Sequence, residues 1–236
     1  RLLRVGFTAE RAPIDLFEDG ERVGTVRTER MHAQLRASAV LANKVGLAFS
    51  LQPEWYEQVA EVGASDAATR SHLVQARASM YIDTLNDPIF PHRGLRIAAY
   101  LETADAAFLG NETLTQATAN ATGALPLTPT LTLQGHATLG HTLRGIPPLH
   151  YRYRTGGAFA YGLWEERQFP LLGYQVQEQS GLHLQRLGAA LQLQVWDDGY
   201  VAAQWNAART PDTWTVIANP AAFDHGAGLV LGTDTF

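Results

Sequence analysis

Residues 83–102 read Asp83-Thr-Leu-Asn-Asp-Pro-Ile-Phe-Pro-His-Arg-Gly-Leu-Arg-Ile-Ala-Ala-Tyr-Leu-Glu102, and their pattern organises the rest of the chain. In residues 74–82 before them, and again in residues 95–101, apolar side chains recur at alternate positions. Side chains on a strand point alternately to its two faces, so both segments are predicted strands with one apolar face. Two prolines remove backbone donors and Gly94 permits a positive φ, so a tight turn is predicted between the strands.

The same alternation recurs along the whole chain. Together with the two strands above it predicts about eleven strands with no convincing helix between them, and therefore antiparallel neighbours joined by turns. Residues 54–62, with Trp55 and Tyr56, fit either an aromatic position at a membrane interface or the start of a short helix. The other alternating segments are 3–9, 21–41, 45–51, 117–125, 131–143, 150–161, 187–195, 201–207 and 227–231.

Composition excludes several classes of protein. The formal net charge is −5 and Lys44 is the only lysine, so no basic patch with interleaved aromatics suggests nucleic acid as a partner. The absence of cysteine removes a disulfide framework and thiolate metal ligands. No apolar run approaches the roughly 18 residues of a transmembrane helix, whereas a spanning strand needs only about ten alternating residues.

The two faces of the strands differ in a way that predicts their surroundings. The apolar faces hold mainly Ala, Leu, Val and Gly, and the polar faces hold Gln, Thr, Asn, Ser, His and single Arg residues. Small apolar rows fit lipid contact and polar rows fit a water-filled lumen. We therefore expect an all-β, antiparallel transmembrane β-barrel. The residues expected to face lipid are Leu131, Leu133, Ala137, Leu139, Leu191, Leu193 and Val195, and those expected to face the lumen are Gln134, His136, Thr138, Gln192 and Gln194.

A barrel in a bilayer has to close, because unpaired strand edges are not tolerated in lipid. Bacterial single-chain barrels have even numbers of strands. An odd count of about eleven therefore predicts that residues 1–236 form a single barrel domain that is incomplete at its ends. A passive porin or a soluble β protein is left as an alternative.

The turn and its flanks resemble the strand–turn–strand signature of the Omp85 superfamily of outer-membrane barrels. The resemblance places this chain in a bacterial outer membrane. Arg96 and Glu102, on the polar face of the strand after the turn, become candidates for the lumen wall. The residues that carry the signature are Asp83, Asp87, Phe90, Pro91, Arg93, Gly94 and Leu95.

A second part of the resemblance lies in residues 154–174. Omp85 proteins carry a conserved lumen loop there with an Arg-Gly-Tyr or Arg-Gly-Phe core, and this chain has Leu172-Gly173-Tyr174. Leu172 replaces the family's arginine, which implies a loop held by fewer charges. The resemblance folds residues 156–174 into the barrel, with Gly156, Gly157 and Gly173 as candidate loop residues; an extracellular surface loop is the alternative. Gly173 is then expected at a close backbone approach, and Tyr174 is expected to bond a wall group, with Asp83, Arg96 or Glu102 as the candidates.

Departures of this kind, together with Phe169-Pro-Leu-Leu-Gly-Tyr174 and a glycine-containing strand start at Gln179-Ser180-Gly181, look most like the barrels attached to patatin-like phospholipases, the type Vd autotransporters. In that branch a patatin lipase and a POTRA domain precede a sixteen-stranded barrel, which implies about three strands missing before Arg1 and two after Phe236. The implied function is a membrane anchor and translocation conduit for an attached N-terminal domain. The alternative is an Omp85-type pore for protein insertion or two-partner secretion. The implied partners are the outer-membrane bilayer, the barrel assembly machinery during insertion, and a second barrel or other outer-membrane proteins.

The sequence offers no catalytic or cofactor chemistry. It lacks a Gly-x-Ser-x-Gly nucleophile elbow, and the nearest string, residues 63–67, lacks the second glycine. Asp224-His225-Gly226 is typical of a turn at the start of a strand. His136 and His141 are five apart, on opposite faces of one strand, so they cannot share a metal ion. We expect no enzyme activity, cofactor or metal in this chain, and any lipase activity would lie in a domain outside it.

Overall fold

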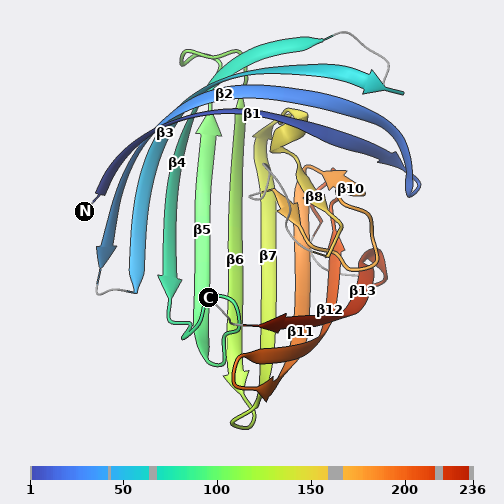
Figure 1. Cartoon of the computed structure of the whole chain (residues 1–236). Helices are drawn as coiled ribbons and strands as arrows, with labels where there is room; N and C mark the ends of the chain where they lie inside the picture. The colour runs from blue at the N-terminus through green and yellow to red at the C-terminus, as the bar shows by residue number, and fades with distance from the viewer. Residues whose placement is uncertain (1, 42–43, 64–67, 159–166, 216–219, 234–236) are drawn as a thin grey trace.

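The structure, a computed structural model, describes residues 2–41, 44–63, 68–158, 167–215 and 220–233. Its main element is one sheet of ten strands in the order β1-β2-β3-β4-β5-β6-β7-β11-β12-β13 (Figure 1). Among the described residues no helix is long and apolar enough to cross a membrane. The ten strands are β1 (Leu2–Glu18), β2 (Glu21–Leu41), β3 (Val45–Val62), β4 (Thr69–Asp83), β5 (Gly94–Ala104), β6 (Leu114–Pro126), β7 (Leu131–Gly145), β11 (His183–Trp196), β12 (Gly199–Arg209) and β13 (Asp224–Thr233).

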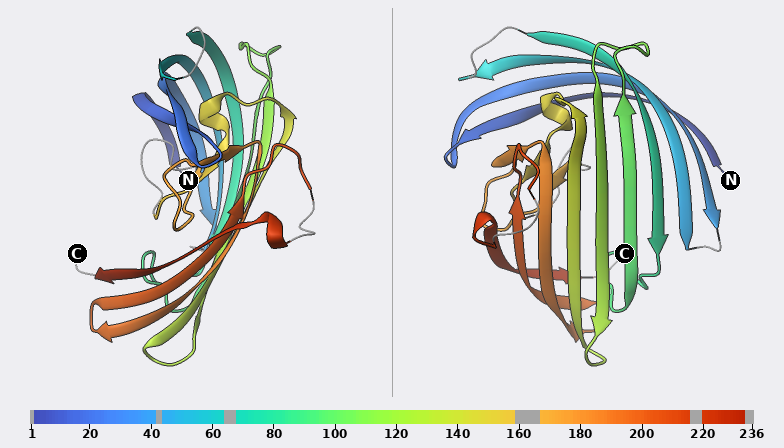
Figure 2. Two further views of the ribbon diagram at one scale, coloured as in Figure 1. Left: turned by 90° about the vertical axis from the view of Figure 1, so that its right-hand side faces the viewer. Right: turned by 180° about the vertical axis from the view of Figure 1, so that it is seen from behind.

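All nine neighbouring pairs in this sheet are antiparallel, which confirms the predicted fold class. The sheet curves strongly, so it has a concave and a convex face (Figure 2). Its two ends differ in their connections. The turn end carries the connections 84–93, 127–130 and 197–198, and the loop end carries 105–113, 146–182 and 210–223.

Side chains alternate between the two faces as the sequence predicts. Leu133 and Leu191, expected to face lipid, are 41% and 44% exposed, whereas Thr138 and Gln192, expected to face the lumen, are 3% and 2% exposed. The strand register explains this, because Leu133 pairs with Leu191 across β7 and β11 and so shares its face. The apolar rows therefore cover the convex face, and the polar rows line the concave face.

Residues 150–161 do not form a barrel strand in their described part, so the count of about eleven is wrong and the described sheet has ten strands. This part contributes to a 3-10 turn, η1 (Leu149–Tyr151), and to β8 (Tyr153–Thr155), which forms a small sheet with β9 (Gln168–Phe169) and β10 (Gln179–Gly181). Tyr153, Arg154 and Thr155 are all buried, so the segment has no exposed apolar face. Gly156 and Gly157 then take φ values of 131° and 76°, which end the strand.

The segment 54–62 is the upper part of β3, so the short-helix interpretation is wrong. Trp55 lies on the convex face between Met31 and His72 of the neighbouring strands. Two positions further toward the loop end, Glu29 and Glu57 pair across β2 and β3, where Arg11 and Arg70 bind them with Nε–Oε1 distances of 3.4 Å and 3.0 Å. A tryptophan followed by a row of charged side chains is typical of the edge of the apolar band of a membrane barrel.

A second η turn, η2 (Pro220–Ala222), precedes β13. At the other side of the sheet, the tip of the β1–β2 hairpin arches over the loop end (Figure 1). There the Asp15 amide donates a hydrogen bond to Gln177 Oε1 (3.0 Å), although the two residues are 162 positions apart. The β1–β2 hairpin therefore contacts the connection between β7 and β11.

Candidate functional site: a loop held inside the curve of the sheet

The connection from β7 to β11, residues 146–182, is here named the inner loop, and the structure describes it at 146–158 and 167–182. Its described parts lie on the concave side of the sheet, while residues 210–215 and 220–223 lie on the convex side (Figure 2). Two small apolar clusters fix its position. Tyr151 packs with Tyr56, Leu73, Ala104 and Leu114 of the wall, and Tyr153 packs with Phe169 and Leu184.

The first polar attachment joins the inner loop to β3. His150 Nε2 lies 2.7 Å from Glu54 Oε1, and both side chains are buried. The Tyr151 hydroxyl donates to Glu54 Oε2 (3.2 Å), and Arg30 Nη1 lies 3.5 Å from the same oxygen. Gln58 Nε2, 3.3 Å from His150 Nδ1, can only donate, so His150 Nδ1 accepts and Nε2 carries the proton given to Glu54.

Burial lowers the pKa of His150, an effect that the hydrogen bond and the charge of Glu54 partly offset. The imidazole is therefore neutral at pH 7. A neutral imidazole donating to an ionised carboxylate is a charge-assisted hydrogen bond, which is stronger than a bond between two neutral groups.

The second attachment joins the inner loop to β5 through Arg167 and Glu102. The Arg167 guanidinium forms an ion pair with Glu102, and both side chains are buried. It also lies near three aromatic rings, with its Cζ 5.4 Å from the ring centroids of Tyr151 and Tyr153 and 6.0 Å from that of Tyr100. Such placement adds cation–π attraction to the ion pair. Burial lowers the pKa of Arg167 to about 10, so the guanidinium remains charged at neutral pH.

The third attachment is on the opposite side, at β12 and β13. The Tyr174 hydroxyl donates to Asp224 Oδ1 (2.9 Å), and Gln179 Nε2 donates to Asp224 Oδ2 (2.5 Å). The Leu172 amide donates to Asn206 Oδ1 (3.1 Å). The inner loop is thus bound to both sides of the curved sheet.

Glycines of the wall make room for the inner loop. A Cβ at Gly140 on β7 would lie 2.5 Å from the Tyr153 ring, and a Cβ at Gly226 on β13 would lie 1.8 Å from the Leu172 carbonyl oxygen. At contacts this short a side chain could fit only if the Tyr153 ring or the Leu172 backbone shifted. The wall is shaped to accept the loop backbone at close range.

The structure changes the expected role of several loop residues. Tyr174 bonds Asp224, so the prediction that it reaches Asp83, Arg96 or Glu102 is wrong. Gly173 has φ of 84° and nothing within 4 Å of an added Cβ, so its positive φ, and not a close approach, requires glycine. Gly156 combines a positive φ of 131° with a close approach, because a Cβ there would lie 1.8 Å from the Gln175 carbonyl oxygen.

Leu172 is buried and carries no charge, yet the inner loop does not lack a luminal ion pair. Arg167, five positions earlier, supplies it with Glu102. The expectation of a loop held by fewer charges therefore does not follow from Leu172 alone. The remaining part of the segment expected to fold inward, residues 159–166, lies outside the described residues.

The residues of the strand–turn–strand signature build the turn itself. Asp87 Oδ1 accepts hydrogen bonds from the amides of Ile89 (2.7 Å) and Phe90 (2.6 Å). Gly94 has φ of 111°, and a Cβ there would lie 2.2 Å from the Thr84 carbonyl oxygen. Arg93 is exposed, and its amide donates to Asn86 Oδ1 (2.8 Å).

Asp83 and Arg96 pair across β4 and β5, with Asp83 Oδ2 and Arg96 Nε 3.7 Å apart. Both are partly exposed and lie near the turn end of the sheet. They are therefore far along the strands from Glu102, which binds the inner loop, although the sequence pattern groups all three as lumen candidates.

Sequence reasoning missed Glu54, His150, Arg167 and Asp224 as a group. Glu102 stands on the polar face of a predicted strand, where a carboxylate is the available signal, whereas Glu54 lies in the segment 54–62 that the sequence pattern did not assign to a strand. The sequence pattern places His150 in a strand and Arg167 in a loop, and nothing in their spacing indicates which wall strand they meet.

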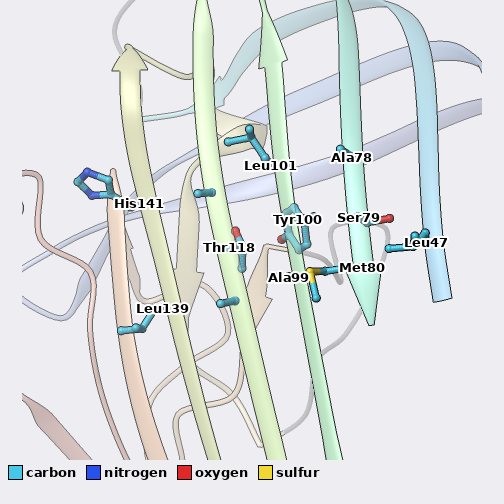
Figure 3. Close-up of a pocket in the computed structure, with 12 residues that line it drawn as sticks. Leu47, Ala78, Ser79, Met80, Ala99, Tyr100, Leu101, Thr118, Leu139 and His141 are labelled. Atoms are coloured by element: carbon cyan, nitrogen blue, oxygen red, sulfur yellow. The ribbon is translucent and has the colours of Figure 1, made fainter. Parts of the chain in front are cut away.

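No catalytic arrangement accompanies these contacts in the described part of the chain. Among the described residues no three His, Asp or Glu side chains form a metal-binding group. Figure 3 shows a hollow over β3 to β7 that no carboxylate lines. Larger side chains such as Leu47, Met80, Leu101 and Leu139 surround a group of alanines there. This hollow belongs to the apolar outer surface and fits acyl chains better than a reacting substrate.

The curved sheet, its apolar outer face and its docked inner loop are features of a transmembrane β-barrel. The profile of the Omp85 superfamily domain matches residues 15–178, so the chain belongs to the Omp85 superfamily. Among solved structures it is similar to "The crystal structure of BamA from Haemophilus ducreyi lacking POTRA domains 1-3", with a TM-score of 0.75 and 11% sequence identity. The match covers 99% of this chain and 53% of that one, so this chain spans about half the length of that BamA chain. No curated protein matches by sequence.

Proposed function

We propose that this chain is the membrane-embedded part of a bacterial outer-membrane barrel that anchors and exports an attached N-terminal domain, with the inner loop as the gate of its lumen. Long extracellular loops and short periplasmic turns are usual in such barrels, so we assign the loop end to the cell exterior and the turn end to the periplasm. The barrel itself carries no lipase or other enzyme activity in this proposal. Ester hydrolysis by the purified chain alone would contradict that part.

The observation that carries the gate is a pair of buried attachments, the ion pair of Arg167 with Glu102 and the hydrogen bond from the neutral His150 ring to the Glu54 carboxylate. Losing one partner of a buried ion pair leaves the other charge uncompensated, which costs about 3–5 kcal/mol. The closed position is therefore well defined. When the lumen fills with water, the same groups are hydrated instead, so the loop can leave as a unit. An apolar plug would lack this second favourable state.

The gate is tested by single-channel conductance in planar bilayers. Arg167→Gln and Glu102→Gln should each raise the open fraction clearly, because each leaves a buried charge without its partner. Arg144→Gln is the matched control, since Arg144 pairs with Asp105 at the exposed loop end (Nη1–Oδ2 3.0 Å). Heat-modifiable migration in electrophoresis checks that each variant is folded. Equal conductance in all three variants and the parent would reject the gate.

A second candidate function is insertion of other proteins into the outer membrane, or two-partner secretion. The likeness to the BamA barrel over 99% of this chain favours it. Two measurements on the full-length protein separate the candidates. Export of an attached patatin-like domain predicts that external protease cleaves this domain on intact cells. An insertion function predicts instead that depletion lowers the amounts of other outer-membrane barrels.

A further inference from the structure

The turn that follows β4, residues 84–93, is here named the lower turn. It is braced from within: Asp87 Oδ1 binds the amides of Ile89 and Phe90, and Asn86 Oδ1 binds the amides of His92 (2.9 Å) and Arg93 (2.8 Å). These bonds fix the backbone around Phe90 and His92. The two side chains are therefore held in a set direction.

The side chains of Phe90 and His92 point across the concave face of the sheet toward its opposite wall. The Phe90 ring stacks on Tyr200 of β12, with centroids 4.4 Å apart and planes inclined by 13°. His92 Nδ1 lies 3.0 Å from Thr132 Oγ1 of β7, and His92 Nε2 lies 3.4 Å from the Tyr200 hydroxyl. The lower turn leaves the sheet between β4 and β5 and thus meets strands well beyond its own neighbours in the sheet order.

Two further contacts show that the far wall is fitted to the lower turn. The Pro91 carbonyl accepts a hydrogen bond from Gln134 Nε2 (3.2 Å), and Gln134 is held in turn by Gln192 Oε1 (2.6 Å). On β13, a Cβ at Gly232 would lie 2.3 Å from Phe90 Cζ. The absence of a side chain at Gly232 therefore leaves the space that the Phe90 ring fills.

These contacts differ in kind from those of the inner loop. Phe90, Pro91 and His92 meet the far wall through a ring stack and through hydrogen bonds of uncharged groups. The inner loop is held instead by buried charged groups near the loop end. Arg167 pairs with Glu102, and the Glu54 carboxylate accepts a hydrogen bond from His150. The turn end of the lumen thus has its own, more weakly held closure.

We propose that the lower turn is a second gate, which closes the periplasmic end of the lumen by latching onto Tyr200 and Gly232 and withdraws when a chain passes. This inference rests on the proposed conduit. It gives the residues of the Asp-x-x-Phe-Pro-x-Arg-Gly turn specific roles, in which Asp87 and Gly94 shape the turn, and Phe90 and His92 close it against the opposite wall.

Conductance of the full-length protein in planar bilayers provides the first test. Phe90→Ala and Gly232→Ala should each raise the open fraction by roughly threefold to tenfold, as expected for the loss of one aromatic pair. The matched controls are Ile89→Ala, whose side chain is exposed in the same turn, and Gly228→Ala, whose added Cβ would make ordinary contacts. Gly232→Ala should add nothing in the Phe90→Ala background, because the crowding exists only with the ring present. Additive effects, or variants that behave as the controls do, would overturn the latch.

A cross-link provides the second test, because the chain contains no cysteine. The double variant His92→Cys/Thr132→Cys should be bridged by a short, reducible bifunctional thiol reagent in the folded protein. Bridging should suppress opening, and reduction should restore it. A folded protein that is not bridged would overturn the latch. If Arg167→Gln raises the open fraction and Phe90→Ala does not, the second gate is rejected and the proposed conduit stands. If neither variant raises it, both the second gate and the conduit are rejected.

Discussion

Glu54 and His150 are 96 positions apart in the chain and share a hydrogen bond of 2.7 Å between Glu54 Oε1 and His150 Nε2, with both side chains buried. Glu54 belongs to the third strand of the sheet, and His150 lies just beyond the seventh. This hydrogen bond therefore exists only when the inner loop is docked against the wall of the sheet.

This bond predicts that docking of the inner loop depends on pH. Burial lowers the pKa of His150 in the docked loop, whereas the free loop would have the usual value of about 6.5. Below that value the free loop binds a proton that the docked loop does not, so docking weakens as pH falls from about 6.5 toward the lowered pKa. Hydrogen exchange of residues 149–155 should rise over this range. His150→Gln should flatten the response, and exchange independent of pH in the parent, after correction for the intrinsic rate, would contradict the prediction.

Leu133 and its neighbour Gln134 provide a test of the two faces. Leu133→Arg should lower the free energy of unfolding by about 2–4 kcal/mol if the site is near the bilayer midplane, because it places a charge in lipid. Gln134→Arg should cost far less, because it points to the concave face. Urea unfolding in lipid vesicles measures both values. Equal losses would contradict the assignment of the convex face to lipid.

Gly140 should tolerate no side chain while the inner loop is docked. Gly140→Ala places a Cβ 2.5 Å from the nearest atom of the Tyr153 ring, and overpacking of this kind costs about 1–3 kcal/mol. Gly135→Ala, on the same strand but with nothing within 4 Å of the new Cβ, is the control. Limited proteolysis should cut the loop faster in the first variant only. Identical cleavage would show that Tyr153 does not rest on Gly140.

Tyr174→Phe should weaken the third attachment of the inner loop, at Asp224, and leave the first attachment, at Glu54, unchanged. The hydroxyl donates to the Asp224 carboxylate, and a hydrogen bond to a charged group contributes about 1.5–3 kcal/mol. Gln179 remains bound to the other carboxylate oxygen, so a loss toward the lower end is expected. Hydrogen exchange should rise at residues 171–179 and stay unchanged at 149–155. Tyr81→Phe, at a partly exposed wall position, serves as the control.

The strands were predictable because a strand with lipid on one side and water on the other repeats every two residues, as Leu133 and Gln192 illustrate. The same rule failed at residues 150–161, where Tyr153 to Thr155 are buried on every side by the loop and the wall. The partner of Tyr174 was missed for a different reason. Alternation identifies the face of a residue, but only the curvature of the sheet decides that β13, and not β4 or β5, lies opposite this tyrosine.

Arg167 illustrates a further limit. The family's arginine position is occupied by Leu172, so comparison of motifs predicts a missing charge. The buried pair with Glu102 forms nevertheless, because a loop that crosses the lumen can offer a guanidinium from another position to the same wall. The physical requirement is one cation near one wall carboxylate, and its place in the sequence is not fixed.

The contact between Asp15 and Gln177 has a consequence for the order of assembly. The tip of the β1–β2 hairpin completes its hydrogen bonds only when a segment 162 positions later has been delivered into the curve of the sheet. Contacts of such sequence separation form late, because the intervening chain must first be ordered. The first hairpin of the described sheet therefore depends on the last part of the inner loop for this hydrogen bond. In a nascent chain halted before Gln177, the Asp15 amide would lack its acceptor.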